Sequence, residues 1–321
     1  MRTPLPVGTH LILSAIGTQQ QITVQIQELI GTGASCLVYT AVCRDGEQNE
    51  FYLRLKEFCP ENLHLMRQQD GSLLAADEEA FQRQMQSFIR GYQKQMQFRQ
   101  FPESCNSISN VQGVFAGNGT RYIAMNCQNS IPLEQQELSL YDTFRVLRAV
   151  AQQLDNLHQH GYLYLDLKPA NVLLYPETPE LVMLFDFDSA IEKSRLSDAV
   201  ISCTAKWAAP EVLQQIRRKI GVASDVYTLG GLLLYLLFRR APEVKDRRNR
   251  AVWDAEFPDS VLAGTSPEIR RMVTQLLQKT LSANPEKRYA SCAELLAQIE
   301  PFLNSFRQPK PYLQTKLPLG N

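Results

Sequence analysis

Three residues suited to phosphoryl transfer lie within one short segment, YLYLDLKPANVLL, which runs from Tyr162 to Leu174. Asp166 can orient an attacking hydroxyl group and accept its proton. Lys168 can neutralise the charge of a transferring phosphoryl group, and Asn171 can hold a metal ion. Each of these residues alone could be an ordinary solvated loop residue, but the ordered set favours a catalytic loop.

A further carboxylate, Asp186, lies in the segment LFDFD, directly after an apolar run typical of a strand. Such a strand would deliver the carboxylate of Asp186 beside Asn171. Two oxygen ligands, together with the phosphates of a nucleotide, suit Mg²⁺, which keeps several water ligands. The sequence therefore predicts a magnesium site at Asn171 and Asp186.

Two glycines, Gly31 and Gly33, lie in a strand–turn–strand segment, IGTGASCLVYTAV. A turn of this kind lets backbone N–H groups approach phosphates closely, although Gly-x-Gly is also common in ordinary hairpins. Lys56 lies farther along the chain in the apolar segment FYLRLKEF. A lysine there costs desolvation free energy unless it is paired, and the alternative is an edge-strand lysine that points to water.

The composition is that of an ordinary globular protein, with 44% hydrophobic and 21% charged residues and a formal net charge of zero. This balance gives no reason to expect a nucleic acid or a membrane surface as a partner. The seven cysteines are scattered and odd in number, which indicates reduced thiols in a cytoplasmic protein. The longest apolar stretch, LGGLLLYLLF, is too short to span a bilayer.

The order of elements predicts a small β-rich part followed by a larger helical part. Short β-branched and aromatic runs predict strands up to residue 58 and a strand–turn–strand over 110–127. Apolar residues at helical spacing predict helices over 77–100, 139–159, 225–239, 267–281 and 290–304. The predicted division is an N-lobe (1–125), a hinge (126–130), a C-lobe (131–304) and a C-terminal tail (305–321).

In this order, the motifs resemble those of a eukaryotic-type serine/threonine protein kinase domain, over roughly residues 20–304. GTGASCLV is similar to the glycine-rich loop of that family, Lys56 to its strand lysine, YLDLKPAN to its catalytic loop and DFD to its metal-binding triplet. TAKWAAPE, SDVYTLG and NPEKRY resemble structural motifs of the large lobe, which kinases of small molecules do not share. The resemblance implies an α+β, bilobal fold, the cofactors ATP and Mg²⁺, and a protein substrate with a Ser or Thr acceptor.

The resemblance also implies roles for individual residues. Thr204 matches a threonine that bridges the catalytic Asp and Lys, so the catalytic residues would be Asp166, Lys168 and Thr204. The ATP site would be formed by Ile30, Gly31, Gly33, Val38, Lys56, Met125, Asn126, Cys127 and Leu173. In the large lobe, Glu211 would pair with Arg288, and Asp225 would hold the backbone of the catalytic loop.

Four departures from the family pattern lie close to these residues. Cys36 replaces the third glycine of the glycine-rich loop, and Tyr164 replaces a histidine that an aromatic ring can substitute. Asp188 replaces the glycine after the Asp-Phe pair, which would restrict the backbone there. Leu165 replaces an arginine that holds a phosphate on the activation segment, so we expect activity that does not require phosphorylation of this segment.

A fifth departure concerns the helix between the lobes. Its glutamate normally pairs with the strand lysine, but residues 80–102 contain no Asp or Glu, and Gly91 stands at the glutamate position. Either Glu78 or Glu79 reaches Lys56, or Lys56 relies on Asp186 and the nucleotide phosphates. Strand alternation also places Arg54 on the same face as Lys56, where it would bend outward or contact phosphate.

Two interpretations therefore compete. The first is an active, ATP- and Mg²⁺-dependent serine/threonine protein kinase. The second is a pseudokinase, a nucleotide-binding or scaffold module without turnover, which the missing helix glutamate, Arg54 and Leu165 favour. The retention of two carboxylates and two lysines in one register favours the active enzyme, because like charges at close range need a metal or a substrate to offset them.

Overall fold

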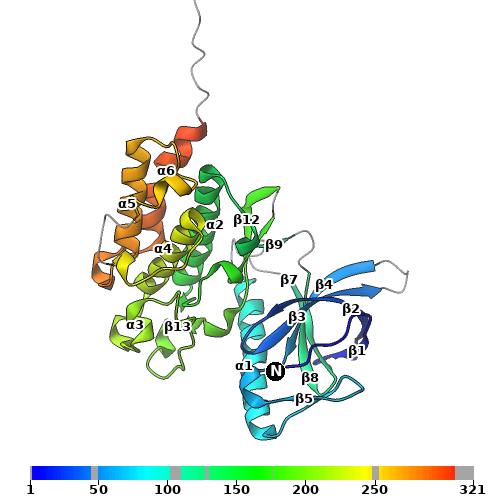
Figure 1. The fold of residues 1–321 in the computed structure, drawn as a ribbon. Helices are drawn as coiled ribbons and strands as arrows, with labels where there is room; N and C mark the ends of the chain where they lie inside the picture. Colours follow the sequence, from blue (N-terminus) through cyan, green and yellow to red (C-terminus); the bar gives the residue numbers. More distant parts are fainter. Residues whose placement is uncertain are drawn as a thin grey trace, which may run out of the picture.

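The computed structural model describes residues 2–44, 50–101, 110–126, 130–175, 177–247 and 253–307. Cys127, one of the expected ATP-site residues, lies outside these ranges. The described chain forms a β-rich N-terminal part and a larger helical C-terminal part, as expected from the sequence (Figure 1). The last helix, α6 (Cys292–Arg307), continues three residues into the predicted tail.

Six strands of the N-terminal part close into a barrel, in the order β1-β2-β3-β4-β8-β7. The first strand closes it, because β1 pairs with both β2 and β7. Alternate residues of these strands point inward, as the period of two requires, and form an apolar interior. The strands are β1 (His10–Ala15), β2 (Gln21–Thr32), β3 (Cys36–Arg44), β4 (Glu50–Phe58), β7 (Asn110–Gly117) and β8 (Thr120–Asn126).

The helix α1 (Glu78–Phe98) packs beside this barrel, on the side that faces the C-terminal part (Figure 1). Asp77 caps its first turn, because the Asp77 side chain accepts a hydrogen bond from the backbone N–H of Ala80 at 2.9 Å. Phe81 and Phe88 face inward and contact the ring of Phe58 at centroid distances of 5.3 and 5.2 Å. This contact fixes α1 against β4, the strand that carries Lys56.

The segment before α1 forms a small hairpin, β5 (Met66–Arg67) and β6 (Leu73–Leu74), and contributes to a buried ion pair. Arg67 donates to both carboxylate oxygens of Glu57, at 3.1 and 2.7 Å. The hydroxyl groups of Tyr39 and Tyr122 donate to the same carboxylate, at 3.0 and 2.7 Å. Because an unpaired buried carboxylate is costly, these four hydrogen bonds explain how Glu57 is tolerated inside the barrel.

The C-terminal part is built around α2 (Leu140–Gln159), which packs against α4 and α6. Ser139 caps α2 by accepting the backbone N–H of Asp142, and Gly161 follows its end with a φ of 84°. The other helices are α3 (Pro210–Leu213), α4 (Val222–Phe238), α5 (Pro267–Thr280) and α6 (Cys292–Arg307). The short strands are β9 (Ile131–Pro132), β10 (Tyr162–Leu163), β11 (Val172–Tyr175), β12 (Thr178–Leu184) and β13 (Ile191–Glu192).

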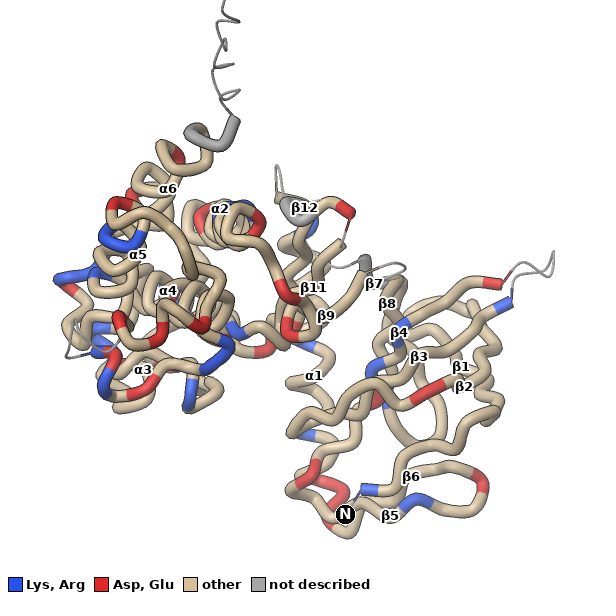
Figure 2. The backbone as a smooth tube through the Cα atoms, turned by 45° about the horizontal axis from the view of Figure 1, so that its top comes forward, with Lys and Arg blue, Asp and Glu red and all other residues tan. Residues whose placement is uncertain are grey.

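Acidic and basic positions are interspersed in both parts of the chain, consistent with the zero formal net charge (Figure 2). The helix α4 is the most apolar of the long helices, and most of its residues are buried in the core of the helical part. Within the described ranges, none of the helices combines the length and the apolar character needed to cross a bilayer.

Candidate active site

The three expected catalytic residues meet at the end of the catalytic loop. The Lys168 Nζ lies 2.7 Å from Oδ2 of Asp166 and 2.6 Å from Oγ1 of Thr204. The backbone N–H of Thr204 donates to the other oxygen, Oδ1, of Asp166 at 2.7 Å. Both carboxylate oxygens of Asp166 therefore accept hydrogen bonds, which fixes the direction in which this side chain can meet a substrate.

A β-hairpin places the two expected metal ligands at one end of a pair of strands. β11 and β12 are antiparallel, with Val172 opposite Leu184, so Asn171, just before β11, and Asp186, two residues after β12, lie at the same end. The amide nitrogen of Asn171 donates to the backbone oxygen of Asp166 at 2.9 Å and to its Oδ2 at 3.2 Å. Because the nitrogen faces Asp166, the amide oxygen of Asn171 is the atom suited to bind a metal ion.

Lys56 forms an ion pair with Asp186 across the two lobes. The Nζ of Lys56 lies 3.1 Å from Oδ1 of Asp186 and 5.6 Å from the centroid of the Phe88 ring. Burial disfavours the charge on Lys56, but the surrounding groups, the Asp186 carboxylate first among them, together outweigh this effect and raise the pKa of the ammonium group above its ordinary value. Burial likewise opposes ionisation of Asp186, and the charge of Lys56 nevertheless lowers the pKa of this carboxyl group. Both groups are therefore held in their charged forms.

The glutamates at the start of α1 do not reach Lys56. Glu78 accepts a hydrogen bond from Gln82, and Glu79 forms an exposed ion pair with Arg83 at 3.4 Å. Of the alternatives that the sequence left open, the structure shows the pair of Lys56 with Asp186.

Asp188 is a second carboxylate near Lys56. Shielding from water by the surrounding protein, followed by the negative charge of Asp186, raises the pKa of Asp188 to about 6, although part of the residue is exposed. The charge of Lys56 acts in the opposite direction on Asp188. From the sequence, the only effect expected of Asp188 is a restricted backbone in place of a glycine. A signal was present, since one carboxylate is missing from the helix and an extra one stands in the DFD triplet.

Three of the expected ATP-site residues share one hydrophobic cluster. Val38 on β3, Met125 on β8 and Leu173 on β11 pack together, and they come from both lobes. An apolar cluster of this kind suits the faces of a nucleotide base. Asn126 is the last residue of β8, and it precedes the part of the predicted hinge that lies outside the described residues.

The glycine-rich turn connects β2 and β3. Gly31 lies opposite Val38 in the β2–β3 pairing, and the backbone N–H of Gly33 donates to the carbonyl of Cys36 at 2.9 Å. Ile30 is on β2 and partly exposed. Arg54, on the neighbouring strand β4, donates through Nη2 to the carbonyl oxygen of Ser130, the last residue of the predicted hinge.

Tyr164 and Leu165 are held rigidly although they depart from the family pattern. The Tyr164 hydroxyl donates to the carbonyl oxygen of Phe185, and its ring packs edge-on against Phe187 at 5.3 Å. Leu165 is buried and has a φ of 64°, a left-handed conformation that is uncommon outside glycine. The carboxylate of Asp225 accepts the backbone N–H groups of Tyr164 and Leu165, at 2.9 and 2.7 Å. The expected role of Asp225 is therefore confirmed.

The predicted pair of Glu211 and Arg288 is also confirmed. Arg288 donates through Nη1 and Nη2 to the two carboxylate oxygens of Glu211, at 2.7 and 2.9 Å. Both side chains are almost completely buried. The pair ties α3, which follows the activation segment, to the loop between α5 and α6.

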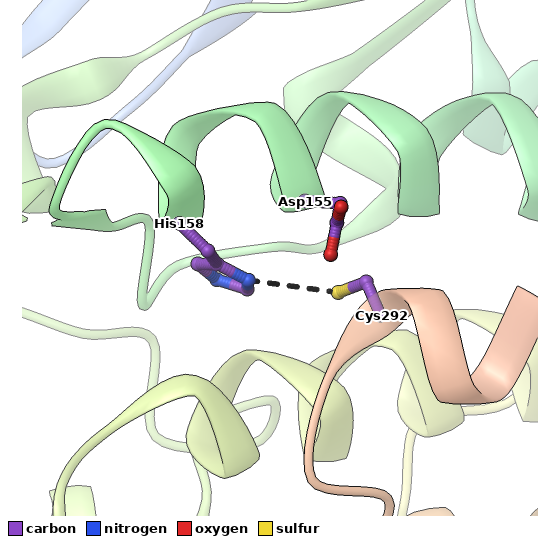
Figure 3. Close-up of side chains that lie close together, drawn as sticks. All are labelled: Asp155, His158 and Cys292. Atoms are coloured by element: carbon purple, nitrogen blue, oxygen red, sulfur yellow. Dashed lines mark hydrogen bonds between the residues drawn. The ribbon is translucent and has the colours of Figure 1, made fainter.

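A separate cluster of Asp155, His158 and Cys292 joins α2 to α6 (Figure 3). The potential ligand atoms of these residues lie within 4.8 Å of one another, close enough to suggest a metal site. The Nδ1 of His158 faces the Sγ of Cys292 at 3.7 Å, and its Nε2 lies 2.8 Å from Oδ2 of Asp225. His158 thus links Asp225, which holds the backbone of the catalytic loop, to helix α6.

Both oxygens of Asp155 in this cluster have protein partners. Oδ1 accepts the backbone N–H of Ala293 in the first turn of α6, at 3.3 Å, and Oδ2 accepts the side chain of Gln159 at 2.7 Å. Burial raises the pKa of Cys292 well above its ordinary value, which favours the neutral thiol over the thiolate that a metal requires. Hydrogen bonds within the protein therefore explain why Asp155, His158 and Cys292 lie close together.

Comparison with known proteins agrees with this geometry. A family model described as the protein kinase domain matches residues 76–299. The serine/threonine-protein kinase PknD of Protochlamydia amoebophila is 26% identical over 186 residues, which cover 51% of this chain and 19% of that protein. The serine/threonine-protein kinase PknB of Mycolicibacterium smegmatis is 29% identical over 162 residues, which cover 48% of this chain and 25% of that protein.

A solved structure is similar along nearly the whole chain. The PknI kinase domain of Mycobacterium tuberculosis, as a C20A_R136N double mutant, superposes with a TM-score of 0.57 at 20% identity and covers 95% of this chain and 100% of that chain. The present chain spans only 19% and 25% of the length of the curated relatives PknD and PknB. The family model nevertheless covers more than half of the chain, and its match includes the loop from Asp166 to Asn171, Asp186 and the Glu211–Arg288 pair. The chain therefore belongs to the protein kinase domain family.

Proposed function

We propose that this protein transfers the γ-phosphoryl group of ATP to Ser or Thr hydroxyl groups of protein substrates. The observation that carries this proposal is the hydrogen-bonded set of Asp166, Lys168 and Thr204. A lysine two residues after the catalytic Asp, bridged to it by a threonine, resembles the serine/threonine pattern. The names of PknD and PknB, both serine/threonine-protein kinases, support the same substrate class.

In this proposal, Asp166 orients the acceptor hydroxyl group and takes its proton. Lys168 lies 2.7 Å from Asp166 and carries the positive charge that offsets the charge of the transferring group. The ion pair with Asp186 holds the Lys56 ammonium group ready for the nucleotide phosphates. Catalysis would consist mainly of positioning and charge neutralisation, because phosphoryl transfer requires little covalent participation by the protein.

The residues fit ATP with Mg²⁺. Asn171 and Asp186 offer an amide oxygen and an ionised carboxylate, which are hard oxygen ligands of the type that Mg²⁺ prefers. When bound, Mg²⁺ would supply positive charge at the phosphate oxygens. Val38, Met125 and Leu173 would enclose the adenine between the two lobes.

A transfer assay tests the proposal. We expect the parent protein to label a generic acceptor protein such as casein from labelled ATP and Mg²⁺, and we expect Asp186→Ala to abolish the transfer. Removal of Asp186 takes away a metal ligand and the partner of Lys56 together, so a loss on the order of 10³-fold or more is expected. Equal background labelling by both proteins would contradict the kinase and favour the pseudokinase, and a thermal shift with Mg²⁺–ATP would then report whether nucleotide binds.

We further propose that activity does not depend on phosphorylation of the activation segment. Leu165 is buried and apolar, so it cannot bind a phosphate. Two basic side chains hold the segment instead. Arg217 donates to the carbonyl oxygens of Leu196 and Ala199, at 2.6 and 2.9 Å, and Lys193 donates to the carbonyl oxygen of His158 at 2.8 Å.

The serines of this segment test that proposal. Ser194, Ser197 and Ser202 are exposed, and we expect a variant with all three changed to Ala to keep kcat within about threefold of the parent. In contrast, Arg217→Ala should lower kcat, because the carbonyl groups that it holds lose their donor. Steady-state kinetics measures both variants. A folded triple variant that has lost activity would contradict the proposed independence.

A further inference from the structure

Helix α1 lacks a side chain where it passes the turn that follows the metal ligand Asp186. Gly91 is buried at this point, and a Cβ atom placed on it would lie 1.7 Å from Oδ1 and 2.9 Å from Cγ of Asp188. Non-bonded heavy atoms do not approach so closely, so a side chain at position 91 would displace this carboxylate. Glycine is also a poor helix former, and the local helix would favour alanine. The close approach of Asp188, and not the helix-forming tendency of the residue, therefore explains why position 91 is a glycine.

The turn that carries Asp188 is fixed on both sides. Asp186 has a φ of 63°, and Phe187–Ser189 form a single 3₁₀ turn, η4. Phe187 is anchored by the ring of Phe98, at 5.1 Å, in addition to Tyr164. Phe187 therefore contacts the C-terminal end of α1, and Asp188 meets the same helix at Gly91.

Helix α1 also holds this turn one helical turn beyond Gly91. The Nζ of Lys94 donates to the carbonyl oxygen of Ala190 at 2.7 Å and lies 3.4 Å from the carbonyl oxygen of Asp188. A residue three positions along a helix lies on the same face. Gly91 and Lys94 therefore form one contact surface of α1, and Asp188 and Ala190 form its counterpart.

The second carboxylate near Lys56 also comes from the turn after Asp186 and not from α1. Glu78 and Glu79 are the only acidic residues of α1, and they lie about 20 Å from Gly91 along the helix axis at 1.5 Å per residue. The Asp188 carboxylate, in contrast, lies against Gly91. Lys56 reaches the same face of α1, because its Nζ lies 5.6 Å from the centroid of the Phe88 ring and Phe88 stands three positions before Gly91. The second carboxylate near Lys56 therefore comes from the DFD triplet.

We propose that Gly91 and Asp188 form a matched pair in which Asp188, and not the helix, supplies a second carboxylate, in addition to Asp186, that positions Lys56 and α1 relative to the catalytic residues. Gly91 provides the space that admits this carboxylate. Asp188 acts as a positioning residue through Lys56. Its effect on catalysis rests on the proposed kinase activity, whereas the pairing with Gly91 does not.

Thermal unfolding without ligand tests the pairing independently of activity. In the parent, Gly91→Ala should lower the Tm because the new methyl group meets the Asp188 carboxylate. In an Asp188→Gly background, the same substitution should raise the Tm, because the space is vacant and alanine favours the helix. The effect of Gly91→Ala on the Tm should thus be negative when residue 188 is Asp and positive when it is Gly.

A matched control is available in helix α4. A Cβ atom at Gly230 would lie 2.3 Å from Oγ1 of Thr280, far in the sequence from Asp188. Gly230→Ala should therefore lower the Tm equally in the parent and in the Asp188→Gly background. If Gly91→Ala behaves like Gly230→Ala, with the same sign in both backgrounds, the pairing is wrong.

Nucleotide binding and kinetics test the positioning role. Asp188→Gly should raise the KM for ATP roughly tenfold and reduce the thermal shift produced by Mg²⁺–ATP, since a carboxylate near Lys56 is lost. Gly91→Glu alone should be worse, because its side chain meets Asp188. The double variant Gly91→Glu/Asp188→Gly returns a carboxylate from the helix side and should recover to within a few-fold of the parent.

The outcomes separate this inference from the proposed function. A double variant no better than Asp188→Gly, in either nucleotide binding or KM, would overturn the positioning role. A parent without phosphoryl transfer would contradict the proposed function alone, because the Tm cycle and the nucleotide-induced shift need no turnover.

Discussion

Replacement of Asp166 by Asn is expected to lower kcat by roughly 10²- to 10⁴-fold, the range typical of a lost general base. The substitution preserves the size of the side chain but removes its negative charge. One of its two terminal atoms becomes a donor, which faces either the Lys168 ammonium group or the Thr204 N–H group. The KM for ATP should change much less, since Asp166 is assigned to the acceptor hydroxyl group and not to the nucleotide.

Steady-state kinetics with Mg²⁺–ATP and casein measures this effect. Asp198→Asn is a suitable control, because Asp198 is an exposed aspartate of the activation segment outside the catalytic set. It should retain the kcat of the parent. An Asp166→Asn protein with parental kcat would show that another group accepts the proton.

Replacement of Asp225 by Ala should have the largest effect on stability, with a loss of about 3–5 kcal/mol in the free energy of unfolding, the range expected when the central acceptor of a buried hydrogen-bonded network is removed. Asp225 is 0% exposed. Its carboxylate accepts the backbone N–H groups of Tyr164 and Leu165 and lies 2.8 Å from Nε2 of His158. Without it, these buried donors have no acceptor, and the left-handed conformation of Leu165 loses its support.

Urea unfolding at constant pH gives this free energy, and kcat measured at a temperature where the variant is folded gives the effect on the catalytic loop. Asp254→Ala, at an exposed loop position, serves as the matched control and should change the stability by less than about 0.5 kcal/mol. Equal losses from both substitutions would mean that the hydrogen bonds of Asp225 do not support the loop.

The local elements and the catalytic spacing could be predicted from the sequence. Apolar residues recur at helical spacing over many turns of α1. The predicted ends of this helix therefore agree with the structure to within about two residues. Asp166, Lys168 and Asn171 lie within six residues of each other, and a single loop conformation brings them together. Glu211 and Arg288 were predicted as a pair because family motifs fix their register.

The contacts between distant segments could not be predicted in the same way. The sequence left three possible partners for Lys56, because the position of a helix relative to a strand depends on packing that local periodicity does not encode. The closure of the barrel by β1 depends on pairing with β7, about a hundred residues away. The buried Glu57–Arg67 pair was likewise not predicted, since nothing in the local pattern distinguishes it from two exposed charges.

The sequence by itself determined the family and the departures from the family pattern, and it predicted the proposed catalytic set, because these depend on residue types at short and fixed spacings. It showed a helix without a glutamate and a triplet with an additional aspartate as two separate facts. Only the tertiary structure showed that the two are related, because Asp188 occupies the space above Gly91. The physical reason is that two atoms cannot share one volume, and this constraint acts between segments that meet only when the chain has folded.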